Sequence, residues 1–253
     1  MYNNFNKEIL RHHYDNQELY LGRVPFLYRK FKTGGLVCVG INPSFPEHQK
    51  AVQEVCKFLN KHSSNDRPPI ITGVAEFVSL HEASELKSDD VEKILSIQDV
   101  YRENYSYYKQ FRALADYVGL ELQELEVFQV RETAQKKLIK HLDANPEFAL
   151  RSVELFIKML DVCNPRAIII ANAGAVKFLC EFAPNLFPII QTGGKDEQVG
   201  LSAPVDAKIG THLYRGKVPL FYTSMLTGQR ALDTGSRQRL FWHVDYAIKQ
   251  NSH

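Results

Sequence analysis

The chain has 253 residues, of which 44% are hydrophobic and 24% charged, the composition of a globular protein with a substantial core. Its formal net charge is +2, so a basic surface for a nucleic acid must be local rather than spread over the chain. No apolar run approaches the roughly 18 residues of a membrane span, and the N-terminus MYNNFNKEIL has no signal-peptide core. We therefore expect a cytoplasmic protein without membrane contact.

The cysteines and histidines show no spacing typical of a metal site. Four cysteines are scattered along the chain without a Cys-x-x-Cys pair, and the nine histidines form no His-Glu-x-x-His pattern. The sequence thus predicts no metal, no iron–sulfur cluster and no other cofactor.

The chain is organised around residues 36–47, LVCVGINPSFPE. The short apolar run Leu36–Val39 lies between glycines, which predicts a strand buried on both faces. Pro43 fixes its own φ and disfavours the helical region for Asn42, so the Asn42 side chain is held on a stiff corner. Ligands of open α/β sheets bind beyond the carboxyl ends of strands. The alternative is an ordinary turn that ends a strand.

The remaining pattern alternates helices and strands. Apolar runs predict further strands over residues 125–130, 166–171 and 218–222. Apolar periodicity and capping signals predict one or two helices in 1–33, and helices over 47–61, from 88 to the stop at Gly119, after Asn145-Pro146, after Gly174, and around 240–248. The loop-rich stretch 184–216 suits a β-hairpin or a long surface excursion. We expect a three-layer α/β/α sandwich with a central, mostly parallel four-stranded sheet, forming one domain over 1–253.

Three segments, in this order, resemble the uracil-DNA glycosylase superfamily: GINPS (residues 40–44), NPRAIIIANAGAVKFL (164–179) and VPLFYTSMLTGQR (218–230). GINPS is similar to the first motif, in which a strand ends in Gly-x-Asp/Asn-Pro, with Asn42 at the acid-or-amide position as in the mismatch-specific branch. The last segment lies where the family carries a His-Pro-Ser-like loop that enters the minor groove. The chain departs from the family in having no histidine in residues 219–230, where one typically stabilises the departing base.

The resemblance implies a hydrolase that excises uracil, or another deaminated or mispaired base, from DNA after flipping it out of the helix, as in base-excision repair. It implies a monomer whose partner is DNA containing such a base. Asn42 is the implied catalytic residue; because an amide carries no charge that accepts a proton, it orients water instead. The implied base pocket comprises Gly40, Ile41, Pro43, Ser44, Phe77 and Gln129, and the implied DNA-binding residues are Ser224, Met225, Leu226, Thr227, Gly228, Arg230 and Arg237.

Each of these assignments has a structural alternative. Phe77 suits an ordinary core position, and Gln129 suits an exposed position on a strand. Met225 and Leu226, proposed to wedge into a base stack, equally suit folding back onto the core. Asp233 suits a helix cap.

Two other functions compete with this interpretation. The missing histidine favours a catalytically weak or inactive relative that binds nucleic acid, or an altered base, without cleavage. An unrelated α/β enzyme acting on a nucleoside or nucleotide is the third candidate, although the chain has no Gly-x-Gly-x-x-Gly or Walker A sequence to support it.

Overall fold

The computed structural model describes residues 4–46, 48–62, 71, 73–188, 211–223, 225–226 and 231–251. They divide into two compact units, each built from three stretches of chain. Unit 1 comprises Met1–Phe31, Asn42–Tyr108 and Phe128–Phe148, and unit 2 comprises Lys32–Ile41, Lys109–Val127 and Ala149–His253. The expectation that the whole chain acts as one domain stays a prediction.

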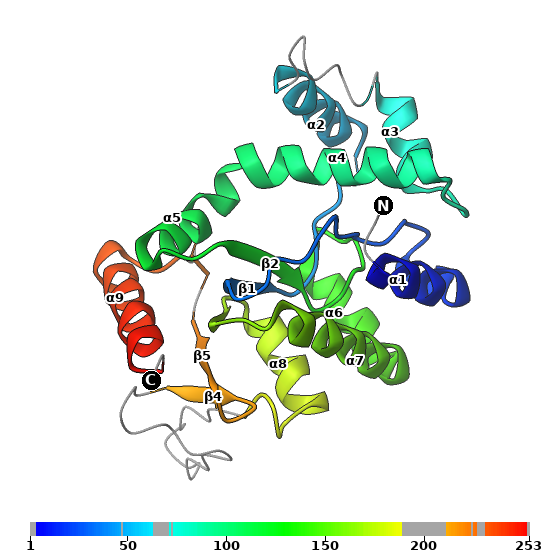
Figure 1. Cartoon of the computed structure of the whole chain (residues 1–253). Helices are drawn as coiled ribbons and strands as arrows, with labels where there is room; N and C mark the ends of the chain where they lie inside the picture. Colours follow the sequence, from blue (N-terminus) through cyan, green and yellow to red (C-terminus); the bar gives the residue numbers. More distant parts are fainter. Residues whose placement is uncertain are drawn as a thin grey trace. The chain divides into compact units, whose positions relative to one another are not determined.

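Unit 2 contains the sheet (Figure 1). Its described strands, in the order β2-β1-β3-β5-β4, are β2 (Leu122–Glu126), β1 (Leu36–Gly40), β3 (Ala167–Ile170), β5 (Val218–Tyr222) and β4 (His212–Tyr214). All neighbours are parallel except β4, which pairs antiparallel with β5. The mostly parallel sheet is confirmed, but the prediction of four strands is wrong, because the hairpin β4–β5 adds an antiparallel edge strand.

Helices cover both faces of this sheet, which confirms the predicted three-layer sandwich. They are α5 (Lys109–Val118), α7 (Pro146–Cys163), α8 (Ala173–Phe182) and α9 (Thr234–Gln250). The right-handed crossovers between parallel strands place α7 and α8 together, while α5 packs against α9 on the other face. Figure 1 shows α5 and α9 on one side of the sheet and α7 and α8 on the other.

Unit 1 is helical. Its described elements are α1 (Asn4–Asp15), η1 (Gln17–Tyr20), α2 (Gln49–Lys61), α3 (Val74–His81), α4 (Ser88–Asn104), η2 (Ser106–Tyr108) and α6 (Gln135–Asp143). The predicted apolar face of α2 is confirmed, since Val52, Cys56 and Leu59 are buried. No described helix of the chain is long and apolar enough to span a bilayer.

Two predicted boundaries are wrong. The helix expected to run from residue 88 to Gly119 is broken at Tyr105, whose extended backbone (ψ 131°) separates α4 from η2 and α5. The second strand covers 122–126 instead of 125–130, so Gln129 lies beyond the strand. Residues 127–130 are buried but belong to no strand of the sheet. Their apolar run reflects burial, and for this reason it was wrongly predicted as a strand.

Candidate functional site

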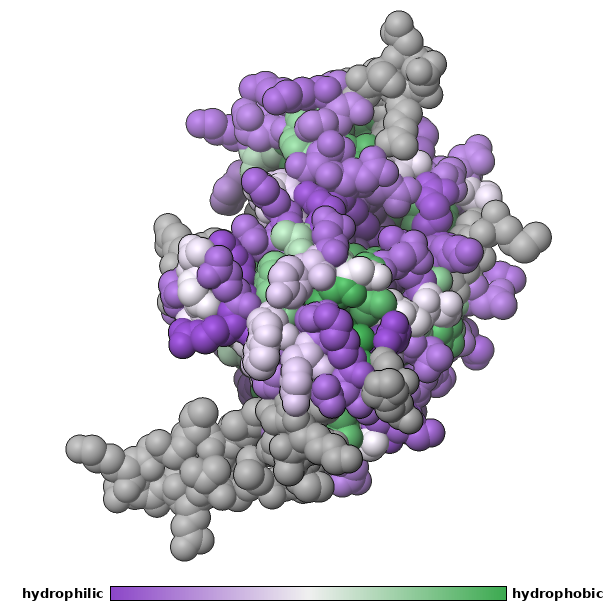
Figure 2. All heavy atoms as spheres, turned by 60° about the vertical axis from the view of Figure 1, so that its left-hand side comes forward, coloured by the Kyte–Doolittle hydropathy of each residue, from purple (hydrophilic) through white to green (hydrophobic). Residues whose placement is uncertain are grey.

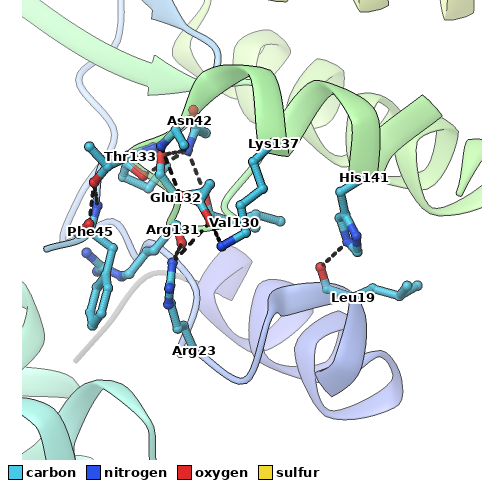
Figure 3. Close-up of polar contacts among 12 residues, drawn as sticks. Leu19, Arg23, Asn42, Phe45, Val130, Arg131, Glu132, Thr133, Lys137 and His141 are labelled. Carbon is cyan, nitrogen blue, oxygen red and sulfur yellow. Dashed lines mark hydrogen bonds and ion pairs between the residues drawn. The ribbon is translucent and has the colours of Figure 1, made fainter. Parts of the chain in front are cut away.

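The Asn42 corner lies in unit 1 beside the segment 130–133, which follows β2 in the chain. The Nδ2 atom of Asn42 donates to the backbone oxygens of Pro43 (2.9 Å), Val130 (3.1 Å) and Glu132 (2.7 Å), as Figure 3 shows. In return the Glu132 N–H donates to the Pro43 oxygen (3.0 Å). The corner is thus fixed by hydrogen bonds to a second segment as well as by the proline ring.

These contacts decide what the Asn42 amide can do chemically. Its nitrogen carries two hydrogens and faces three carbonyl oxygens, so both hydrogens are used and the orientation of the amide is set. Within the described part of the chain, Oδ1 of this half-buried residue accepts no hydrogen bond. Asn42 therefore offers an acceptor to a water molecule, and its amide N–H groups are not available to a base.

The Glu132 carboxylate is fully buried beneath this corner. Oε1 accepts from the backbone N–H of Ala134 (2.9 Å). Oε2 lies 2.9 Å from Lys137 Nζ and 3.5 Å from Arg23 Nη1. A buried carboxylate needs such partners to offset its desolvation, so Glu132 supports the segment and is not placed as a proton acceptor.

Phe45, three residues after Asn42, is held to the same segment. Its N–H donates to the Thr133 hydroxyl oxygen (3.0 Å), and that hydroxyl donates to the Phe45 carbonyl. The Arg23 guanidinium lies over the Phe45 ring, 4.5 Å from its centroid, a cation–π contact. The Arg23 Nη1 also donates to the Arg131 oxygen (2.7 Å), which fixes the guanidinium in this position (Figure 3).

A pocket of about 260 Å³ opens in unit 1 beside Phe45. Its volume lies just below the ~300–1,000 Å³ of drug-sized ligand sites, which suits a single-ring ligand. The start of α2 and one face of α3 form its walls, and polar groups from three parts of unit 1 line an otherwise apolar surface. The lining residues are Arg23, Phe45, Pro46, Gln49, Val52, Val74, Val78 and Glu82.

Sequence reasoning missed this pocket. Arg23 and Glu82 lie in no motif, and only the fold of unit 1 brings them to one pocket. Phe45 carried the one available signal, because it directly follows GINPS.

A neutral histidine packs behind the pocket wall. His81 ends α3, its Nδ1 donates to the Phe77 oxygen (2.8 Å), and its ring stacks on that of Phe77 at 4.1 Å. Burial, and then the nearby charge of Arg131, lower the pKa of His81 to about 3. The imidazole is therefore uncharged at neutral pH and supplies no proton or positive charge to a ligand.

Two predicted base-pocket residues are buried without lining the pocket. Phe77 is buried in a cluster with His81 and Phe45, whose rings lie 4.1 and 6.1 Å from its own, and this agrees with the core alternative. Gln129 is buried beyond β2 instead of exposed on a strand, and its backbone oxygen accepts from the Phe26 N–H (2.9 Å). Neither side chain is open to a flipped base in this arrangement.

The rest of the GINPS motif spans the two units. Gly40 and Ile41 belong to unit 2, where a Cβ on Gly40 would lie 2.2 Å from the Glu126 carboxylate. That carboxylate, at the end of β2, belongs to none of the motifs in the sequence. Pro43 is buried and Ser44 exposed in unit 1.

The predicted DNA-binding loop is described only in part. Ser224, Thr227, Gly228 and Arg230 lie outside the described residues. In unit 2, Leu226 is buried, as its core alternative expects, and Met225 is half-buried with its oxygen accepting from the Leu232 N–H (3.0 Å). Arg237 is half-buried on α9. The cap alternative for Asp233 is confirmed, since its carboxylate accepts from the Ser236 N–H (3.0 Å) at the start of α9.

The comparisons with known proteins add no family assignment. No protein-family model, no curated protein and no solved structure matches the chain. Among the described residues, no group of three or more histidine, cysteine, aspartate or glutamate side chains is placed to hold a metal ion. The candidate groups for chemistry are therefore Asn42 and the residues that line the pocket.

Proposed function

We propose that the protein is a DNA N-glycosylase that hydrolyses the bond between the sugar and uracil, or another deaminated or mispaired base, in cytoplasmic DNA. The observation that carries the proposal is the Asn42 amide, whose nitrogen is bound by three carbonyl oxygens while Oδ1 is left as an acceptor. A water that donates one hydrogen to Oδ1 directs a lone pair of its own oxygen away from the amide, toward the sugar carbon that carries the base.

The uncharged amide sets the expected rate. Cleavage proceeds through a sugar-cation-like state, and water adds once positive charge has developed on the sugar. Asn42 takes no proton from that water, so the reaction lacks the ~10²–10⁴-fold contribution of a general base. The proposal therefore predicts a slow enzyme that acts on bases which leave easily, such as uracil.

In this proposal the pocket beside Phe45 receives the extruded base. Uracil presents two carbonyl oxygens on either side of an N–H group. Arg23 offers donors, Glu82 an acceptor and Gln49 both, which complements such an edge. The positive charge of Arg23 also offsets the negative charge of the departing base, the task for which the family uses a histidine.

The test is a labelled duplex containing uracil opposite guanine, incubated with the protein and then treated with alkali to cut abasic sites. We expect scission by the wild-type chain and its loss in Asn42→Ala. The matched control is Asn104→Ala in the same unit, which removes an amide that donates to one carbonyl oxygen, that of Val100 (3.0 Å). A folded wild-type protein that leaves the duplex intact contradicts the proposal.

A second candidate is a relative that binds DNA or an altered base without cleaving it. It is favoured because Asn42 accepts no proton and the Glu132 carboxylate is bound by Lys137 and Arg23. Salt-dependent binding of the uracil duplex without scission would select this function.

A further inference from the structure

The outward face of α9 carries aromatic rings that the core does not use. Val244, Ala247 and Ile248 form the buried side of this helix. On the opposite side, Trp242 is 58% exposed and its ring stacks on that of Tyr246 at 5.4 Å, with 13° between the planes. Polar residues are the usual occupants of such a face, whereas Trp242 exposes most of its ring and rests on the half-buried Tyr246.

A second aromatic contact lies between α9 and α5, the helix beside it in unit 2. Tyr117 is 54% exposed, and its ring lies 5.8 Å from that of Phe241. We call Tyr117, Phe241, Trp242 and Tyr246 the aromatic face. Figure 2 turns the side of the sheet with α5 and α9 toward the reader, and pale residues of intermediate hydropathy lie there among strongly hydrophilic ones.

Positive charges flank the aromatic face along α9. Arg239 precedes Trp242 by three residues and Lys249 follows Tyr246 by three, so both share the outward side of the helix. Lys249 forms an ion pair with Asp245 (2.6 Å), the sole acidic residue in the sequence of α9. The exposed Arg239 donates to the Ser236 hydroxyl at 3.4 Å, and that hydroxyl donates to the Asp233 carboxylate (2.6 Å), so one carboxylate lies near this charge at the start of α9.

We propose that the aromatic face binds single-stranded DNA, with a base stacked on the Trp242–Tyr246 pair and a phosphate near Arg239. Stacking on aromatic side chains and cationic contacts to the backbone are the two elements of single-strand binding. Duplex DNA keeps its base faces covered, so it engages only the charges. The choice of DNA over RNA rests on the proposed function. The inference that a single-stranded nucleic acid binds here rests only on the aromatic rings and the positive charges of α9.

The chain contains a single tryptophan, so Trp242 reports its own contacts by fluorescence. We would titrate the full chain with a short oligothymidylate, with a duplex of equal length, and with heparin as a polyanion without bases. The oligothymidylate should quench the emission to saturation, the duplex should quench it less, and heparin should not quench it.

Affinity is then measured by the anisotropy of a labelled oligothymidylate. Trp242→Ala should weaken binding about 5- to 150-fold, the effect of losing one stacked base, and Trp242→Phe should weaken it less. The matched control is Val162→Ala, which truncates another exposed apolar residue of unit 2, 44% exposed on α7. Control and wild-type affinities should agree.

Several results overturn the inference. The first three are no quenching by oligothymidylate, equal quenching by heparin, and equal affinity of Trp242→Ala and wild type. The fourth is a blue shift of the emission that depends on protein concentration without DNA, which would identify a second copy of the chain as the occupant of the aromatic face. Asn42→Ala should still show the quenching. Quenching without base excision therefore rejects the glycosylase proposal alone, and excision without quenching rejects the aromatic face alone.

Discussion

The Asn42→Asp variant tests whether the hydrogen bonds around Asn42, or the resemblance of its motif to an acidic one, decide what this position tolerates. The resemblance alone suggests that an aspartate here supplies a better catalyst, because some members of the family carry an acid at this position. The structure predicts damage instead, since a carboxylate oxygen would replace Nδ2 and face the carbonyl oxygens of Pro43, Val130 and Glu132.

The magnitude follows from two contributions. Losing two hydrogen bonds costs about 1–3 kcal/mol, at ~0.5–1.5 kcal/mol each. The facing oxygens disfavour the charged form and raise the pKa of the new carboxyl above its usual value of about 3.9; a rise of about two pKa units costs about 3 kcal/mol at neutral pH. Together the free energy of unfolding should fall by roughly 4–6 kcal/mol, a large part of the ~5–15 kcal/mol of a typical protein.

The assay is urea unfolding at several pH values, with wild type and Asn104→Asp as references. A raised pKa in the folded state means that the stability of Asn42→Asp is best below about pH 3.9, where the acid is neutral and donates one hydrogen bond. Stability is then lost as the pH rises through the folded-state pKa. Wild-type stability of Asn42→Asp at pH 7 would refute the arrangement of three carbonyl oxygens around this side chain.

Two further predictions concern glycines and a histidine. Gly35→Ala should lower the free energy of unfolding by roughly 2–3 kcal/mol, because its Cβ would lie 2.3 Å from the backbone oxygen of Glu121. Gly40→Ala should lower it by less than about 1 kcal/mol, because its Cβ would meet only the end of the Glu126 side chain, which can move. Equal losses for the two variants in urea unfolding would contradict this. Wild type should lose up to ~1.36 kcal/mol per pH unit as the pH falls below about 6.5, because the pKa of His81 is lowered to about 3 in the folded state. His81→Phe keeps a ring in place and should lack that part of the slope; identical pH profiles would show that His81 is not buried in neutral form.

The fold was predictable where local pattern and final environment agree. The runs at β1, β3 and β5 are apolar because both faces of these strands are covered, and the stripe of α2 is buried as its spacing indicates. The strand β4 has three residues and pairs with β5. The loop-rich pattern of 184–216 suits a β-hairpin, but no apolar run marks the position of this short strand. The end of β2 was misplaced because residues 127–130 are buried in unit 1 and unit 2 without pairing as a strand.

The site was predictable only at its corner. Asn42-Pro43 predicts a stiff turn, but two of the three carbonyl oxygens that hold the amide belong to Val130 and Glu132, 88 and 90 positions later in the chain. The pocket depends on Arg23 and Glu82, which carry no motif and meet only in the folded unit. Long-range contacts of this kind are invisible to spacing and propensity.

The most direct test of the central claim is the rate at which free uracil is released from a duplex with uracil opposite guanine, measured by chromatography under single-turnover conditions. We expect slow release by the wild-type chain and a rate at least about 100-fold lower for Asn42→Ala, the scale of losing one positioning contact at a reacting centre, with Asn104→Ala unchanged. Equal rates for wild type and Asn42→Ala would show that Asn42 does not position the attacking water.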